Sequence, residues 1–355
     1  MELYRMTTTS RVPTDDRGDV TIAPSARRRA DNARQRQVAR WQARFPVLQL
    51  VALIVIVIYG GASITGYDSA PSVKSMLVLA ALLGLAALPQ TLVVLLGGID
   101  LSIPAFIAVG GVITAELGGG HQWPIYEVLP LIIAVCALGG AVNGFLCHRF
   151  GANPLVVTLG MYAIFEGAIL VWTKGNIGAT PPVSLTNWTS VTGTTAGIGI
   201  PPIVTLWVVV AVITGLALSR TAPGRRLYAT GTNLRAARIA LVRTELIWTI
   251  VFMLSAILSG LTGVLVAGYT SGASPTMGDP YLFQGLTAVI VGGTAIGTAR
   301  GDYWRTVLGA LILTALTTVL IGKGLDANDT QILFGLVILV VVAAYGRERR
   351  VRERV

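Results

Sequence analysis

The sequence has little charge and almost no sulfur or imidazole. Of its 355 residues only 12% are charged and 53% are hydrophobic, and the mean hydropathy is +0.70. A soluble globular domain carries about 25% charged residues, so this composition excludes an ordinary soluble enzyme. The chain has two histidines, and its two cysteines, Cys136 and Cys147, lie 11 positions apart in one apolar run. We therefore expect neither a disulfide nor a bound metal.

Long stretches of the chain contain no charged residue. A helix needs about 20 apolar residues to cross a bilayer, and most of these stretches are of that size or larger. The sequence predicts an all-α, polytopic membrane protein with about ten transmembrane helices. The predicted spans are residues 46–64, 76–97, 102–117, 127–148, 154–173, 201–219, 246–268, 281–297, 306–321 and 330–345.

The positive charge is unevenly distributed along the chain. The net charge is +10, which alone is compatible with nucleic-acid binding, but its placement indicates a membrane orientation instead. With the N-terminus inside, 24 of the 27 Lys and Arg residues lie on the inner side, and only Lys74, Lys174 and Lys323 lie outside. This follows the positive-inside rule. We expect a multi-pass protein of the plasma (inner) membrane with both termini in the cytoplasm, and no nucleic-acid partner.

Three regions follow from this distribution. Residues 1–45 are polar and Arg-rich without the apolar core of a signal peptide, which predicts a disordered cytoplasmic tail. Binding of lipid headgroups by this tail is the alternative. Residues 46–345 form the predicted transmembrane domain, and residues 346–355 form a short basic cytoplasmic tail.

The sequence motifs of ATP binding and of common enzymes are missing. The chain contains no GxxxxGK(S/T), HExxH, GxSxG or CxxC sequence, so we expect no catalytic residue and no cofactor. Ion-coupled carriers usually need ionisable groups within the membrane, and Glu166 alone lies well inside a predicted span. Transport driven by an external motor is favoured. An ion-coupled secondary carrier, or a channel, for a small polar solute is the alternative.

The loop from residue 220 to residue 243 combines turn signals with a short basic helix. Pro223 and Gly224 form a turn signal, and Asn233 is a plausible N-cap for a helix over 234–242. Three alanines offer a close-packing surface, and two arginines share one face of this helix. Such a helix suits docking into a partner's groove or contact with anionic lipid. The coupling residues assigned here are Gly224, Arg225, Gly231, Asn233, Arg235, Ala236, Ala237 and Arg238.

Four segments resemble the permeases of ribose-type ABC importers, a family that includes ribose, xylose, arabinose, galactofuranose and autoinducer-2 permeases. They are residues 224–238, 96–102 (LGGIDLS), 153–160 (NPLVVTLG) and 291–301 (VGGTAIGTARG). The similarity extends from about residue 50 to residue 345. The chain departs from the family at Ile239-Ala240, where Ser-Gly is common, at Glu166-Gly167, where Arg-Gly is common, and at Ala295 and Thr298, which replace Ser and Gly.

The resemblance implies the ABC importer permease fold and a permease subunit that imports a monosaccharide or related polyol by alternating access. It implies three kinds of protein partner beside the lipid bilayer: a cytosolic ATP-binding subunit, a second permease chain, identical or related, and an extracytoplasmic sugar-binding protein. Residues 224–243 would carry the motion of the ATPase into the helices. The residues assigned to the substrate pathway are Gly97, Gly98, Asp100, Ser102, Asn153, Thr158, Glu166, Gly292, Gly293 and Thr294.

Several of these assignments have a simpler alternative. The break at 97–102 is a pathway or gate element, or a turn whose Asp100 caps a helix. Gly292 to Thr294, expected inside a span, serve helix packing or a kink during alternating access. Residues 275–280 are expected to form a tight external loop, which either meets the binding protein or is a plain turn.

Overall fold

The computed structural model describes residues 46–294, 299–326, 329–336 and 339. The chain divides into a short N-terminal unit, residues 1–47, and one large unit, residues 48–355. The predicted tails at 1–45 and 346–355 lie outside the described residues. The described helices are α2 (Val47–Ser63), α3 (Ala70–Leu96), α4 (Ile103–Ile113), the π-helix η1 (Thr114–Gly120), α5 (Ile125–Arg149), α6 (Pro154–Thr173), α7 (Val183–Thr189), α8 (Pro202–Arg220), α9 (Ala222–Thr232), α10 (Leu234–Ile239), α11 (Thr244–Thr270), α12 (Asp279–Val291) and α13 (Tyr303–Gly322).

The predicted all-α membrane fold is confirmed. Nine of the ten predicted spans coincide with α2, α3, α4 with η1, α5, α6, α8, α11, α12 and α13. Seven of these helices are long and apolar enough to cross a bilayer, while α2 and α12 are shorter, with 17 and 13 residues. In the tenth span, residues 330–336 and 339 are helical and the remainder lies outside the described residues.

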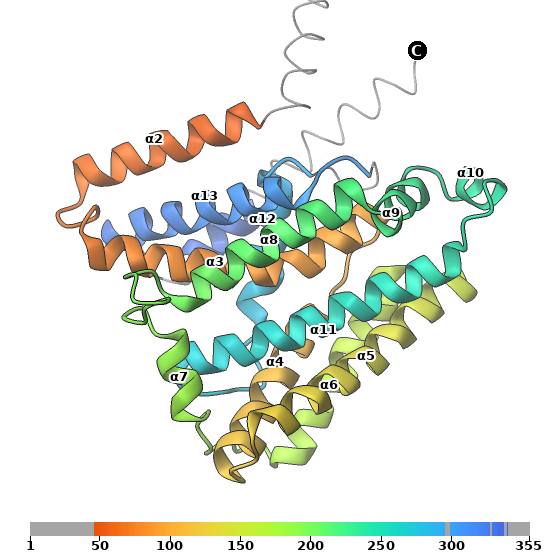
Figure 1. Ribbon diagram of the computed structural model, residues 1–355, viewed down its shortest axis with the longest axis horizontal. Coiled ribbons are helices and arrows are strands. Elements are labelled where there is room, and N and C mark those ends of the chain that lie inside the picture. Colours follow the sequence, from red (N-terminus) through yellow and green to blue (C-terminus); the bar gives the residue numbers. More distant parts are fainter. Residues whose placement is uncertain (1–45, 295–298, 327–328, 337–338, 340–355) are drawn as a thin grey trace, which may run out of the picture. The chain divides into compact units, whose positions relative to one another are not determined.

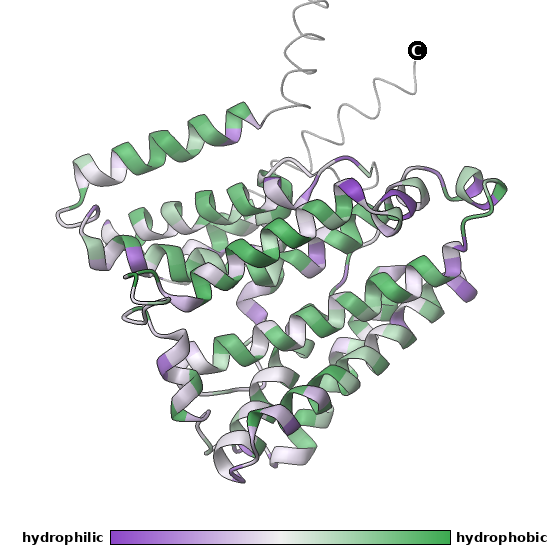
Figure 2. Ribbon diagram, viewed as in Figure 1, coloured by the Kyte–Doolittle hydropathy of each residue, from purple (hydrophilic) through white to green (hydrophobic). Residues whose placement is uncertain are grey.

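Two helices form the interior of the bundle. Every residue of α3 from Ala80 to Leu96 is buried, and so is every residue of α4. The buried part of α3 and all of α4 are mostly apolar on every side, as expected of helical segments that neither water nor lipid reaches. In Figure 1, α3 runs beside α8, α12 and α13, and α11 runs beside α4 and α5, in agreement with their contacts. Figure 2 shows hydrophobic residues along these helices and hydrophilic ones mainly at their ends and in the α9–α10 segment.

Glycines allow α11 to approach α4 and α5 closely. A Cβ atom on Gly263 of α11 would lie 1.9 Å from the carbonyl oxygen of Ile107 on α4, and one on Gly110 of α4 would lie 1.9 Å from that of Gly260. On α5, a Cβ atom on Gly140 would lie 2.4 Å from the carbonyl oxygen of Phe252. Small residues permit such backbone contact where no hydrophobic force pulls helices together in lipid. The positions of α4 and α5 therefore depend on α11.

The substitution Gly263→Ala tests this packing. We expect it to lower the free energy of unfolding by about 1–3 kcal/mol, because the added methyl group forces two backbones apart. The measurement is the thermal unfolding midpoint of the purified full-length chain in detergent. Gly160→Ala on α6, where a Cβ atom would meet nothing within 4 Å, is the matched control. Equal midpoints for the two variants would contradict the interpretation.

Candidate functional site

The loop after α8 folds into the two short helices α9 and α10. The Thr221 hydroxyl accepts the Gly224 amide at 3.4 Å at the start of α9. Asn233 caps α10 as predicted, since its side-chain oxygen accepts the amides of Arg235 and Ala236, both at 3.0 Å. This is the preferred arrangement of an Asn N-cap.

The helix α10 is shorter than predicted, ending at Ile239 instead of residue 242. Leu241 follows in the left-handed region with φ 60°, and the Val242 amide donates to the Ala237 carbonyl at 3.0 Å. This bond closes the helix in the manner of a Schellman motif. The turn leaves two large apolar side chains at the tip, Ile239 with 83% and Leu241 with 90% of their surface exposed.

The three alanines of this segment do not form one packing surface, which corrects that prediction. Ala237 is buried, whereas Ala236 and Ala240 are exposed. Arg235 is exposed at the tip, together with Ala236. Side chains three to four positions apart share a helix face, and the turn after α10 brings Leu241 into the exposed set. The outward surface of the segment, which we call the α10 tip, consists of Arg235, Ala236, Ile239 and Leu241.

Arg238 ties α10 to the ends of two long helices. Its Nε donates to the Thr244 hydroxyl at 3.3 Å, and its NH2 group lies 3.2 Å from the ring nitrogen Nε2 of His148. The same ring nitrogen lies 3.0 Å from the Thr244 hydroxyl. Thr244 begins α11 and His148 lies in the last turn of α5. Arg238 therefore links α10 to both α5 and α11 through polar contacts.

The helix α9 lies against the end of α3. A Cβ atom on Gly231 would lie 2.0 Å from the Leu95 carbonyl oxygen, and one on Gly224 would lie 2.3 Å from that of Leu218. Both predicted glycines therefore serve close backbone contact. Arg225, the remaining member of the predicted set, is exposed, and its guanidinium donates to the Arg220 carbonyl at 3.1 Å.

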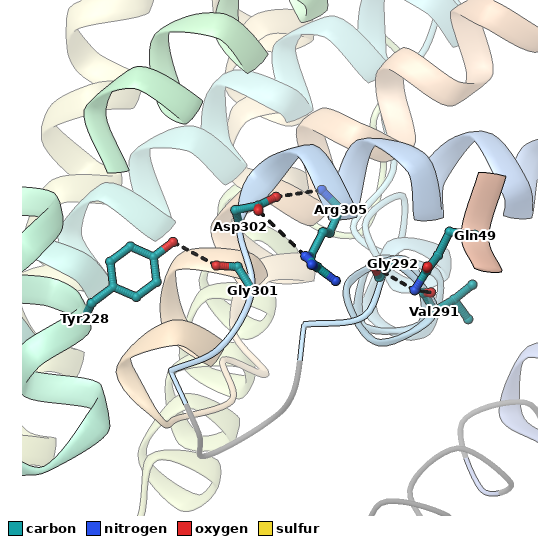
Figure 3. A network of polar contacts seen from close by, with 7 residues as sticks. All are labelled: Gln49, Tyr228, Val291, Gly292, Gly301, Asp302 and Arg305. Carbon is teal, nitrogen blue, oxygen red and sulfur yellow. Dashed lines mark hydrogen bonds and ion pairs between the residues drawn. The ribbon is translucent and has the colours of Figure 1, made fainter. Parts of the chain in front are cut away.

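Tyr228 connects α9 to the segment between α12 and α13. Its hydroxyl donates to the Gly301 carbonyl at 2.8 Å (Figure 3). Burial, and secondly the Asp302 carboxylate, raise the pKa of Tyr228 to about 12, so the phenol keeps its proton at physiological pH. The sequence prediction did not include Tyr228. The sequence signal for Tyr228 was its position inside residues 224–238, a segment that resembles the ABC importer permeases.

The structure places Gly292, Gly293 and Thr294 after the end of α12, which corrects the span predicted over 281–297. The helix ends at Val291, and the Thr294 amide donates to the Val289 carbonyl at 3.1 Å. Gly293 has φ 97°, a conformation that glycine adopts at little cost and that ends helices. Ala295 and Thr298 lie outside the described residues.

A polar network surrounds this glycine segment (Figure 3). The Gln49 amide on α2 donates to the carbonyl oxygens of Val291 at 3.3 Å and Gly292 at 3.1 Å. Asp302 caps α13, because its carboxylate accepts the Arg305 amide at 2.9 Å and lies 3.7 Å from the Arg305 Nε. The glycine segment thus lies at the same end of the bundle as the α9 contact.

Asp100 is buried at the break between α3 and α4. Its carboxylate accepts the amide and the hydroxyl of Ser102, and the Ser255 hydroxyl of α11 donates to its second oxygen at 2.8 Å. Asn143 of α5 donates to the Ser102 hydroxyl at 3.0 Å. Asp100, Ser102, Asn143 and Ser255 all have 0% exposure. The break is therefore a junction of three helices. Ser102 occupies the N-cap position of α4, but its hydroxyl donates to Asp100 and makes no capping hydrogen bond.

Other predicted pathway residues support the same junction. The Thr158 hydroxyl on α6 accepts the Leu101 amide at 3.0 Å, and Asn153 caps α6 by accepting the Leu155 amide at 3.0 Å. Gly97 ends α3 with φ 100°, and Gly98 is buried beside Val93 and Pro154. Of the ten predicted pathway residues, Glu166 lies apart from both this junction and the glycine segment.

Glu166 lies well inside α6, half-buried, one turn from Tyr162. The Tyr162 hydroxyl donates to the Asp279 carboxylate at 3.0 Å. A Cβ atom on Gly278 would lie 2.1 Å from the Pro104 carbonyl oxygen, so the segment before α12 reaches the first turn of α4. The turn predicted over 275–280 is present and packs against the bundle, while its external side stays a prediction. In the described part of the chain, no three His, Cys, Asp or Glu side chains come together as a metal site.

The substitution Asp100→Ala tests the junction. We expect it to lower the free energy of unfolding by about 2–5 kcal/mol, because the buried hydroxyls of Ser102 and Ser255 lose their acceptor. The matched control is Asp68→Ala, which removes an exposed carboxylate between α2 and α3. Thermal unfolding of both variants in detergent measures the difference, and a midpoint for Asp100→Ala equal to that of the control would refute the role of the junction.

Sequence comparisons agree with this geometry. The profile of the family described as "Branched-chain amino acid transport system / permease component" matches residues 72–342. The chain is 32% identical over 300 residues to the ribose import permease protein RbsC of Bacillus subtilis, covering 84% of this chain and 90% of the relative. It is 30% identical over 305 residues to the fructose import permease protein FrcC of Rhizobium meliloti, covering 83% of each chain.

A third relative is the autoinducer 2 import system permease protein LsrC of Salmonella paratyphi B, which is 28% identical over 306 residues, covering 86% of this chain and 87% of the relative. The predicted resemblance to ribose-type permeases is confirmed. With its apolar helices and a family match over most of its length, the chain is a multi-pass membrane permease subunit and belongs to the family of the branched-chain amino acid transport system permease component.

Proposed function

We propose that the chain imports a monosaccharide or related polyol as the permease subunit of an ATP-driven, binding-protein-dependent transporter. The observation that supports this proposal most strongly is the α10 tip, where Ile239 and Leu241 are exposed on the same short segment as Arg235. Exposed apolar side chains of this size next to positive charge suit a protein partner. The relatives named as ribose and fructose import permeases support the choice of substrate class.

The α10 tip is proposed to face the cytoplasm and to dock on the ATP-binding subunit. The charge distribution supports this orientation, because the six arginines of residues 220–243 fall on the side with the greater positive charge. Both termini then lie in the cytoplasm. A second permease chain and an external sugar-binding protein complete the proposed assembly.

Two routes are proposed to carry the motion of the ATPase into the membrane. One runs through Arg238 to α5 and α11, which it holds through His148 and Thr244. The other runs through α9, which contacts the end of α3 at Leu95 and the segment before α13 at Gly301. Because the two routes end on different helices, one displacement of the segment changes their spacing, which is what alternating access requires.

Glu166, Tyr162 and Asp279 are proposed to line the substrate pathway. Tyr162 donates to the Asp279 carboxylate, and Glu166 lies one turn along α6 from Tyr162, so two carboxylates and a phenol lie near one another. Sugar hydroxyls donate well to carboxylates, and ionisable residues within a membrane generally face protein or water. The buried residues Asp100, Ser102 and Thr158 are proposed to act as a pivot beside this pathway and not as ligands.

The decisive experiment is reconstitution in proteoliposomes with the ATP-binding subunit and the binding protein. We expect sugar-loaded binding protein to stimulate ATP hydrolysis, and uptake to require ATP. Uptake by the chain without an ATPase, driven by an ion gradient, would establish the ion-coupled carrier instead.

The substitution Ile239→Asp tests docking at the α10 tip. We expect uptake to fall at least about tenfold, because a charge replaces an apolar contact at the partner surface, while the chain folds normally. Ile198→Asp is the matched control, since Ile198 is also largely exposed but lies in the loop between α7 and α8. Uptake by Ile239→Asp at the level of this control would contradict the docking role.

The substitution Tyr228→Phe tests the contact between α9 and Gly301. It removes one hydrogen bond and keeps the ring, so we expect the sugar transported per ATP hydrolysed to fall about two- to tenfold. Tyr126→Phe, at a largely exposed position of α5, is the control. A transport ratio unchanged from the native protein would show that this contact does not transmit motion.

A further inference from the structure

An apolar groove separates α2 from α13. It encloses about 360 Å³ and is lined by Val55, Ile56 and Tyr59 of α2, by Leu316, Val319 and Leu320 of α13, and by Lys323 and Leu325 after it. Lys323 is the sole charged residue of this lining. The groove is distinct from the α10 tip and from the proposed substrate pathway.

The helix α2 is held at two places on either side of this groove. Near its start, Gln49 donates to the Val291 and Gly292 carbonyls. Past its end, Ile64 lies against Gly322, where an added Cβ atom would come within 2.7 Å of it. Between these attachments α2 stands off from α13 and leaves the groove open. In Figure 1, α2 runs beside α13 along the edge of the bundle.

An empty groove of this kind is unfavourable in a membrane. Its lining side chains would lack contact atoms on one side and lose dispersion energy. Water does not compensate, because the lining offers almost no polar partner. In a bilayer, the acyl chain of a lipid is the group that matches such an apolar lining.

The charged end of the groove indicates which lipid binds there. The Lys323 ammonium lies 5.7 Å from the Tyr59 ring centroid and donates to the Ser63 carbonyl at 3.3 Å. These contacts hold the cation at the mouth of the groove. Within the described residues no carboxylate lies within ion-pair distance of Lys323.

The nearby acidic residues are turned toward the backbone. Asp326 and Asp329 accept each other's amides, at 2.9 Å from the Asp329 amide and 3.2 Å from the Asp326 amide. The Lys323 cation therefore remains available for an anionic group. A lysine at the end of an apolar helix commonly reaches the interface, where lipid phosphates lie.

We propose that this groove binds one anionic phospholipid, with an acyl chain between α2 and α13 and the headgroup phosphate at Lys323. The bound lipid fills the space between the two helices and completes the packing of α2. The relevant probe is phosphatidylglycerol, compared with zwitterionic phosphatidylcholine.

The test is native mass spectrometry of the full-length chain from nanodiscs that contain equal amounts of these two lipids. We expect the native chain to retain phosphatidylglycerol preferentially. Lys323→Gln should reduce this preference about fivefold, the effect expected of one lysine near an anionic headgroup. Lys174→Gln removes another exposed lysine that does not line the groove and should leave the preference unchanged.

A second pair of variants tests the groove itself. Val55 lines the groove and Val57 does not, although both lie on α2 and are 58% and 46% exposed. We expect Val55→Trp to lose one retained lipid per chain and Val57→Trp to retain it. Equal lipid retention by the two variants would overturn the proposal, as would an unchanged preference in Lys323→Gln. A change of oligomeric state in Val55→Trp without lipid loss would assign the groove to a second protein chain and also overturn it.

Discussion

The buried carboxylate of Asp100 joins the start of α4 to α11, and through Ser102 and Asn143 to α5. The break between α3 and α4 exposes backbone groups that lipid cannot satisfy, and each unsatisfied group would cost several kcal/mol. The side chains of Asp100 and Thr158 satisfy two of these groups, the amides of Ser102 and Leu101. A chain break can therefore exist deep inside a bundle of apolar helices, and the positions of α4, α5 and α6 follow from it.

The same helices receive the contacts of the α9–α10 segment. Arg238 contacts α5 and α11. These two helices also carry Asn143 and Ser255, which belong to the Asp100 junction. Glycines along α11 keep it against α4 and α5 at backbone distance, so these helices move as one packed group more readily than they slide apart. The helix α9 contacts α3 and the Gly301 carbonyl instead. The α9–α10 segment therefore contacts α3, α5 and α11, and α11 packs against both of the others.

The glycine-rich segment at residues 292–294 lies after the end of α12, whereas its composition predicts a position inside a membrane span. Glycines inside a predicted span usually indicate close helix packing, and Gly292 does lie against the backbone of Arg305. Gly293, however, ends the helix, and the chain turns beside Gln49 of α2. The segment therefore lies beside the start of α2, at the same end of the bundle as the contact that Tyr228 makes with Gly301.

The sequence alone determined the class of the protein, because charge-free runs of membrane length admit only helices. It also determined the local capping by Asn233, whose partners lie two and three residues away. Only the tertiary structure decided that Ala237 faces inward while Ala236 faces outward, that Asp100 meets Ser255, and that Tyr162 meets Asp279. These contacts join residues that are distant in the chain or depend on where a short helix ends, and helical periodicity carries no information on either.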